Sequence, residues 1–347
     1  MNIISALRIG LKQVGRTRRM VLFAWLVNVA LALTVAVPLL VQLNGYLRGS
    51  TMEEPLLRSI DSNWFQTFKA DNQGSDLTRY LDYTIFGVAP FLSHYHSYLL
   101  GSTVKNIGNF LFDFFFKWRI GLEYLGTMTI LSFLYVLVST FLSGAFIGTY
   151  AKSYRLTFQE FLVEGGKYFG RFFRLSLLSL IVYVLLFEVI FDWWSGKIPV
   201  WTALDRSEMA PYVQYMIRNG VAVVVLGFVA LCFDYAKIRI VVDDRISALF
   251  AVGSGVTFVF KHPGATGGLY VLLTLAGVAW IALYGLVDGA VEQTGYWTIM
   301  FVFLFQQVYM IGRLCIKAAF FASQTQLYRS HAAPEYQIDV PAGALPS

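Results

Sequence analysis

The chain has 347 residues, of which 57% are apolar and 17% aromatic, while only 14% are charged, and its formal net charge is +6. Soluble globular proteins carry about 25% charged residues, so this composition excludes an ordinary soluble domain and favours a membrane protein. The two cysteines, Cys232 and Cys315, both lie in long apolar runs, which argues against a disulfide framework or a cysteine metal site.

Six apolar runs are each long enough to cross a hydrocarbon core of about 30 Å as a helix. They are continuously apolar, and backbone polar groups cannot go unpaired in lipid, so the fold class is all-α and a barrel is excluded. The first run exceeds the apolar region of a signal peptide and is expected to be a retained helix. The expected membrane spans are 20–43, 127–150, 173–194, 219–236, 266–287 and 297–322.

Lysine and arginine are distributed unevenly around these spans. The segments 1–19, 151–174, 237–261 and 313–347, which lie on one side of a six-helix bundle, hold 17 of these residues together, and the short loop 195–218 on the other side holds 3. The long segment 44–126 is set aside, because long loops translocate almost regardless of charge. Positive residues near spans concentrate on the cytoplasmic side. Both termini are therefore expected in the cytoplasm, and the basic balance reflects topology rather than nucleic-acid binding.

One motif of thirteen residues occurs twice. The stretches "LRIGLKQVGRTRR" (7–19) and "LVEGGKYFGRFFR" (162–174) share Leu, Gly, Lys, Gly, Arg and Arg at one offset, and each precedes an apolar run. A fainter third copy contains Gly255 and Lys261. Such self-similarity indicates repeated structural units. The returning spans support the same period, because each ends in an aromatic-alanine pair, namely Tyr150-Ala151, Tyr235-Ala236 and Phe321-Ala322.

These landmarks predict three tandem units, each an interfacial amphipathic helix followed by a helical hairpin, in a pseudo-threefold arrangement about the membrane normal. In the second unit, the apolar face that includes Phe161, Gly165 and Phe172 is expected to lie in the acyl boundary before the chain bends into its span. The expected units are 1–155, with an extracytoplasmic helical insertion at 44–126, then 156–245 and 246–330, followed by a flexible cytoplasmic tail at 331–347.

Cationic side chains flank the apolar face of the repeated motif. Each is expected to contact anionic lipid headgroups on the cytoplasmic face, where one cation contributes about 1 kcal/mol. Binding of a phosphorylated ligand by the motif is the alternative. The candidate headgroup contacts are Lys12, Arg16, Arg19, Lys167, Arg171, Arg174 and Lys261.

Segment 44–126 breaks the regular pattern. It begins polar and becomes aromatic, and it is expected to form several helices that cover the bundle as a lid or provide a groove for a lipid or a partner helix. Within it, His94 and His96 are a weak candidate for a metal site, which would need further ligands such as Asp82. Interfacial hydrogen bonding is the preferred interpretation, so no metal and no cofactor are expected.

Few ionisable residues fall inside the expected spans. Charges at such depth are costly, which makes them default candidates for function. Asp234 is expected to form a structural ion pair with Arg313 or Lys317, with a proton or ion relay as the alternative, whereas Glu188 has no obvious partner. Amide side chains in the spans are expected to hydrogen-bond between helices. The intramembrane polar candidates are Glu188, Asp234, Arg313, Lys317, Asn28, Gln306 and Gln307.

Four short motifs lie in the stretch "DYAKIRIVVDDRISALFAVGSGVTFVFKHPGATGGLYVLLTLAGVAW". They are Tyr235-Ala236-Lys237, Asp244-Arg245, Ser247-Ala248 and Lys261-His262-Pro263. Through them the chain resembles poorly characterised bacterial six-helix integral membrane proteins, and it is loosely similar to the membrane domain attached to some glycerophosphodiester phosphodiesterases. The resemblance implies a multi-pass protein of the bacterial cytoplasmic membrane. It transfers no catalytic residues, because the phosphodiesterase chemistry of such proteins lies in a separate domain.

Catalytic motifs such as a nucleophile elbow, a phosphate-binding loop or His-Glu-x-x-His do not occur in the sequence. The expected function is therefore a non-enzymatic membrane scaffold or accessory subunit that organises lipids or a membrane protein partner, without nucleic acid. The alternative is a transporter or lipid-handling protein with a path between the three hairpins, and a lipid-modifying enzyme is a third interpretation. A polar cavity near mid-membrane and broken helices would favour transport.

Overall fold

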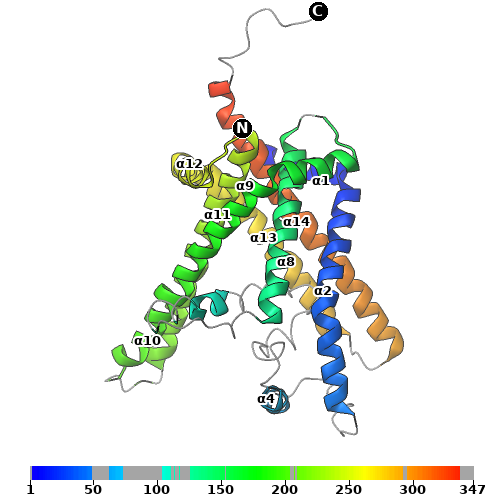
Figure 1. The fold of residues 1–347 in the computed structure, drawn as a ribbon, viewed down its shortest axis with the longest axis vertical. Helices are drawn as coiled ribbons and strands as arrows, with labels where there is room; N and C mark the ends of the chain where they lie inside the picture. The colour runs from blue at the N-terminus through cyan, green and yellow to red at the C-terminus, as the bar shows by residue number, and fades with distance from the viewer. Residues whose placement is uncertain are drawn as a thin grey trace, which may run out of the picture.

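The fold is entirely helical within the residues described by the computed structural model, and six helical segments are long and apolar enough to cross a membrane, as the sequence predicts. Helices α1 (Ile3–Arg16) and α12 (Ala248–Lys261) lie at one end of the molecule, opposite α4 (Ser62–Asp71) and α10 (Asp192–Trp201) (Figure 1). The structure describes residues 2–48, 62–72, 104–110, 113, 117, 126–152, 154–203, 207, 209–291 and 295–336.

The spanning helices are longer than the spans expected from the sequence. The last of them has 41 residues and so extends for about 60 Å, roughly twice the thickness of a hydrocarbon core. It continues through residues 331–336, where the sequence predicts a flexible tail. The helices are α2 (Arg18–Leu47), α8 (Thr127–Ala151), α9 (Phe158–Val184) followed by the π-helix η2 (Leu185–Phe191) and by α10, α11 (Met209–Val242), α13 (Pro263–Ala290) and α14 (Tyr296–Tyr336).

Two of the three amphipathic segments are separate helices. Thr17 separates α1 from α2, and His262 separates α12 from α13, which starts at Pro263. Proline favours the first position of a helix because it lacks an N–H to donate. In contrast, α9 begins at a capping box between Thr157 and Glu160 and then continues unbroken into its span. The bend expected there is wrong, because no proline or other helix breaker follows the repeated motif.

The apolar face at the start of α9 packs against protein. Phe161 is fully buried, and its ring meets Phe146 of α8 edge to face, with 5.2 Å between the ring centroids. Phe172 is also buried, whereas Phe158 is 42% exposed. The expectation that this face lies in the acyl boundary is therefore wrong, because α8 covers most of it. Close aromatic packing of this kind adds to the stabilisation from burial.

Three glycines of the repeated motif lie at close contacts between helices. A Cβ at any of them would stand less than 3.0 Å from an atom of a neighbouring helix, a separation that real Cβ atoms essentially never show. Glycine is therefore required for α1 to pack on α14 and for α12 to pack on α11, where backbone atoms are the close neighbours, whereas at α9 the neighbour is a side-chain ring of α8. The contacts are Gly10 with Ser323, Gly165 with Phe141, and Gly255 with Cys232 and Ala236.

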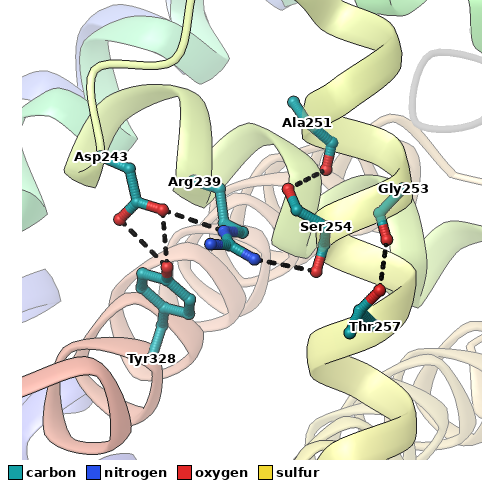
Figure 2. A network of polar contacts seen from close by, with 7 residues as sticks. All are labelled: Arg239, Asp243, Ala251, Gly253, Ser254, Thr257 and Tyr328. Atoms are coloured by element: carbon teal, nitrogen blue, oxygen red, sulfur yellow. Dashed lines mark hydrogen bonds and ion pairs between the residues drawn. The ribbon is translucent and has the colours of Figure 1, made fainter. Parts of the chain in front are cut away.

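A polar network joins α11, α12 and α14 (Figure 2). Arg239 Nε donates to Asp243 Oδ2 at 2.9 Å, and Arg239 Nη1 donates to the carbonyl oxygen of Ser254 at 3.0 Å. The hydroxyl of Tyr328 donates to the same carboxylate, at 2.8 Å from Oδ2. Because the Arg239 and Asp243 side chains are only 16% and 18% exposed, the network holds the end of α11 against the two other helices.

Two histidines lie side by side, His262 between α12 and α13 and His331 on α14. The ring centroids of His262 and His331 are 4.6 Å apart. Burial, and then the charges of His331 and Lys261, lower the pKa of His262. Its pKa in the unfolded chain is about 6.5, so the unfolded state binds a proton more readily, and folding stability is lost as the pH falls below that value.

We therefore expect the folded protein to become less heat-stable between about pH 7.5 and about pH 5.5, and to do so less in the His262→Phe variant. The measurement is the thermal unfolding midpoint in a mild detergent at each pH. An equal decrease in both proteins would contradict the assignment to His262.

Candidate functional site

A cavity of about 1030 Å³ lies between α8, α9, η2, α11 and α14. Small-molecule sites usually occupy about 300–1,000 Å³, so this volume is at the upper end of that range. The wall runs from Thr129 to Ser143 on α8 and from Phe172 to Glu188 on α9 and η2. At the α-helical rise per residue, these stretches are roughly 20 Å long. The cavity therefore extends through much of the thickness of a bilayer.

Aromatic and hydroxyl side chains both line the wall. The Thr140 hydroxyl of α8 hydrogen-bonds the Ser176 hydroxyl of α9 at 3.1 Å, which joins the two helices beside the cavity. A hydroxyl both donates and accepts, so such groups can also bind a ligand. The hydroxyl residues that α8 contributes to the wall are Thr129, Ser132, Tyr135, Ser139, Thr140 and Ser143.

Ionisable side chains stand at two levels of the cavity. Helices α10 and α11 meet at one end of the molecule (Figure 1). Counted from there, Glu188 lies about 20 Å along its helix and Asp234 about 38 Å along α11. Among the described residues of the wall, four side chains are cationic and two are acidic. They are Lys105, Lys237, Arg313, Lys317, Glu188 and Asp234.

Asp234 forms an ion pair with Lys237, three residues further along α11, with 3.0 Å between nitrogen and oxygen. The sequence predicts Arg313 or Lys317 as its partner, but a partner one helical turn away is reached without crossing the cavity. Arg313 and Lys317 nevertheless line the same cavity as Asp234. The structure thus brings Asp234, Arg313 and Lys317 together at one cavity. It also adds Lys237, which lies three residues from Asp234 in the sequence.

The side chain of Lys317 lines the cavity, and its exposed surface faces that space. It also borders a smaller cavity of about 30 Å³ between α2, α8 and α14, which Asn28 lines as well. A space of that size is enough for one or two water molecules. Lys317 therefore stands between a large ligand-sized space and a small one suited to water.

Glu188 lies in the π-helical segment η2 and is half-buried. Single π-helical stretches inside α-helices are frequent at functional sites. A Cβ at Gly108 would collide with the Cγ of Glu188, so segment 104–110 packs directly on this side chain. Lys105 in that segment interacts electrostatically with Glu188. The structure therefore supplies the cationic neighbour that the sequence does not identify.

The predicted amides do not gather at the cavity of about 1030 Å³. The amide nitrogen of Asn28 donates to the Ala24 carbonyl oxygen of its own helix at 2.7 Å. Gln306 and Gln307 are half-buried on α14 and line neither cavity. A path that uses Gln306 as a polar waypoint therefore has no support in this arrangement.

The predicted headgroup contacts are mostly accessible. Arg171 is the exception, because its guanidinium pairs with Asp244 and holds the pKa of that carboxyl below its usual range. His94, His96 and Asp82 lie outside the described residues, and within the described part of the chain no group of three metal-ligating side chains occurs. The exposed cations are Lys12, Arg16, Arg19, Lys167, Arg174 and Lys261.

Comparisons of the chain with protein-family models, with curated proteins and with solved structures find no match. The resemblance to six-helix membrane proteins and to phosphodiesterase membrane domains thus stays a prediction. The functional argument therefore depends on the cavity itself.

Proposed function

We propose that the protein handles a membrane lipid, which it holds in the cavity between α8, α9, α11 and α14. The cavity carries the proposal, because it combines a volume of about 1030 Å³ with a long wall of apolar, aromatic and hydroxyl side chains and charged groups at separate levels. Such a wall suits an amphiphile, whose apolar chains and polar head require different surroundings.

The same observation favours the lipid-handling alternative over the scaffold. A scaffold needs no polar cavity inside the bilayer, and ionisable groups placed there are costly. Transport requires such a cavity and usually interrupted helices, and η2 interrupts the α-helical geometry of the third span beside Glu188. A scaffold or accessory role stays a prediction. We propose no enzymatic activity and no cofactor.

We further propose that the chain is built from three tandem units, 1–155, 156–245 and 246–330, about a pseudo-threefold axis. The glycine contacts support this arrangement, because α9 packs on α8, the returning span of the first unit, and α12 packs on α11, that of the second. Helix α1 packs on α14, the returning span of the third unit, and this contact closes the cycle.

Our proposed location is the bacterial cytoplasmic membrane, with the end that carries α1 and α12 at the cytoplasmic face. Exposed cations on these helices, such as Lys12, Arg16 and Lys261, support this orientation. Anionic lipids of the inner leaflet attract such side chains. The orientation also follows the positive-residue asymmetry of the sequence.

Filling the cavity tests lipid handling. Ser179→Trp places an indole in the cavity, whereas Ile181→Trp places it on the outer surface of the same helix, where Ile181 is 57% exposed. After a delipidating detergent wash, native mass spectrometry should show lipid retained by the wild type and by Ile181→Trp. Retention by Ser179→Trp should fall about tenfold, which corresponds to about 1.4 kcal/mol.

Wild-type protein that retains no lipid, or equal losses in the two tryptophan variants, would contradict the proposal. A stoichiometric protein partner that co-purifies in place of lipid would favour the scaffold.

A further inference from the structure

We infer that the ligand carries an anionic phosphate or phosphodiester headgroup, bound at the α11 and α14 side of the cavity by Lys237, Arg313 and Lys317. The inference rests on the proposed lipid-handling function and adds the chemical class of the lipid. The proposed site binds phospholipids with an anionic headgroup in preference to those with a zwitterionic headgroup.

The first argument is the local charge balance. Among the described residues of the wall at this level, Lys237 already pairs with the carboxylate of Asp234 at 3.0 Å, and Lys317 is a further cation. Lys317 interacts electrostatically with two cations, Lys237 and Arg313, and more weakly with Asp234. In the described part of the chain no carboxylate lies within ion-pair distance of its ammonium group. Cations gathered inside a bilayer are costly unless an anion compensates them.

The second level of the cavity provides an internal comparison. There Lys105 and Glu188 are one cation and one carboxylate that interact with each other. No excess of positive charge arises at that level among the described residues of the wall. An anion is therefore expected beside Lys317 and not beside Glu188.

The third argument is the geometry of the donors. Arg313 and Lys317 are four residues apart on α14 and so lie on one face of that helix, and both line the cavity together with Lys237 from α11. An arginine provides a planar fork for two oxygens, and lysines provide compact charges. Ser139 and Ser143 of α8 border both cavities as Lys317 does, but their hydroxyls donate to carbonyl oxygens of their own helix. The donors for the headgroup are therefore the three cations.

The apolar wall identifies the source of the headgroup. A free anion would need only the cationic level, yet the cavity continues from there past Phe173 and Phe187 toward Glu188. Acyl chains explain this extension, because they gain about 0.8 kcal/mol for each CH₂ group removed from water. The geometry therefore favours a phospholipid over soluble phosphate.

The test compares lipid selectivity in four proteins: wild type, Lys317→Met, Lys317→Arg, and Lys197→Met as a control at an exposed lysine of α10. Each full-length protein is reconstituted in nanodiscs that contain equal amounts of phosphatidylglycerol and phosphatidylcholine with identical acyl chains. It is then extracted in mild detergent, and retained lipid is measured by native mass spectrometry. Size-exclusion chromatography shows that each variant is folded.

Wild type, Lys317→Arg and Lys197→Met should retain phosphatidylglycerol about tenfold over phosphatidylcholine. Lys317→Met should still retain lipid, but with a ratio near one. Retention of both lipids without preference by the wild type, or an unchanged preference in Lys317→Met, would overturn the headgroup inference and leave lipid handling intact.

Two further outcomes separate the remaining possibilities. Absence of retained lipid from all four proteins would overturn the proposed function and this inference together. Inorganic phosphate is added to the wild type in a separate arm. If it displaced phosphatidylglycerol at matched concentration, the site would belong to a soluble anion, and the lipid source would be wrong.

Discussion

Replacing Gly255 with alanine is expected to destabilise the protein by about 2 kcal/mol, the usual range for overpacking. The added methyl group would stand 2.9 Å from the Cys232 carbonyl oxygen and 2.9 Å from the Ala236 backbone nitrogen. Both atoms belong to the backbone of α11 and cannot move aside as a flexible side chain would, so α12 and α11 must separate. The measurement is the free energy of unfolding by a denaturing detergent in mixed micelles.

Gly253, two residues earlier on the same helix, provides the control. A Cβ there would meet no atom within 4 Å, so Gly253→Ala should stabilise the protein by up to about 1 kcal/mol through helix propensity. Gly10→Ala and Gly15→Ala form a second pair of the same kind on α1, because a Cβ at Gly10 would stand 2.8 Å from the Ser323 backbone nitrogen and one at Gly15 would meet no atom within 4 Å. If both members of a pair shifted stability in the same direction, close helix contact would not be the reason for the repeated glycines.

The Asp243→Ala variant should lose about 3 kcal/mol of stability, the lower end of the range for removing one partner of a buried ion pair. It removes the carboxylate that accepts from Arg239 at 2.9 Å and from the Tyr328 hydroxyl at 2.8 Å. Figure 2 shows contacts from this carboxylate to both side chains, so one substitution removes both. The same unfolding measurement applies.

Ser254→Ala is the matched control for this network. The Arg239 guanidinium donates to the main-chain carbonyl oxygen of Ser254 and not to its hydroxyl. Alanine retains that carbonyl oxygen. The serine hydroxyl itself donates to the Ala251 carbonyl oxygen of its own helix. Ser254→Ala should therefore stay within about 0.5 kcal/mol of the wild type. Equal stability of the Asp243→Ala and Ser254→Ala proteins would show that the network does not hold these helices together.

The membrane class and the six spans could be predicted because hydropathy is a local property, and each span requires only its own residues. Helical periodicity also grouped Phe161 and Phe172 on one face correctly. It could not show whether lipid or protein covers that face, since this depends on how closely α8 approaches α9. The bend in α9 was wrong because the motif at Gly165 has no breaker corresponding to Thr17 or Pro263.

The candidate site was predictable only in part. Depth along the chain placed Asp234, Arg313 and Lys317 at one level, and all three line the cavity. The cavity itself could not be foreseen, because residues such as Thr140 and Ser176 are ordinary in a spanning helix until two helices align them. The pairing of Asp234 with Lys237 could have been predicted from the sequence, because residues three apart on a helix are neighbours.

The packing of α1 on α14 has a consequence for biosynthesis. Domains generally fold in the order of translation, at about 5–20 residues per second. Helix α1 is translated long before α14, so its glycine face at Gly10 stays uncovered until α14 follows. Until α14 is inserted, the cavity lacks the wall to which Arg313 and Lys317 belong. Under the proposed function, a lipid of the surrounding bilayer is enclosed at this stage, without any later opening of the finished protein.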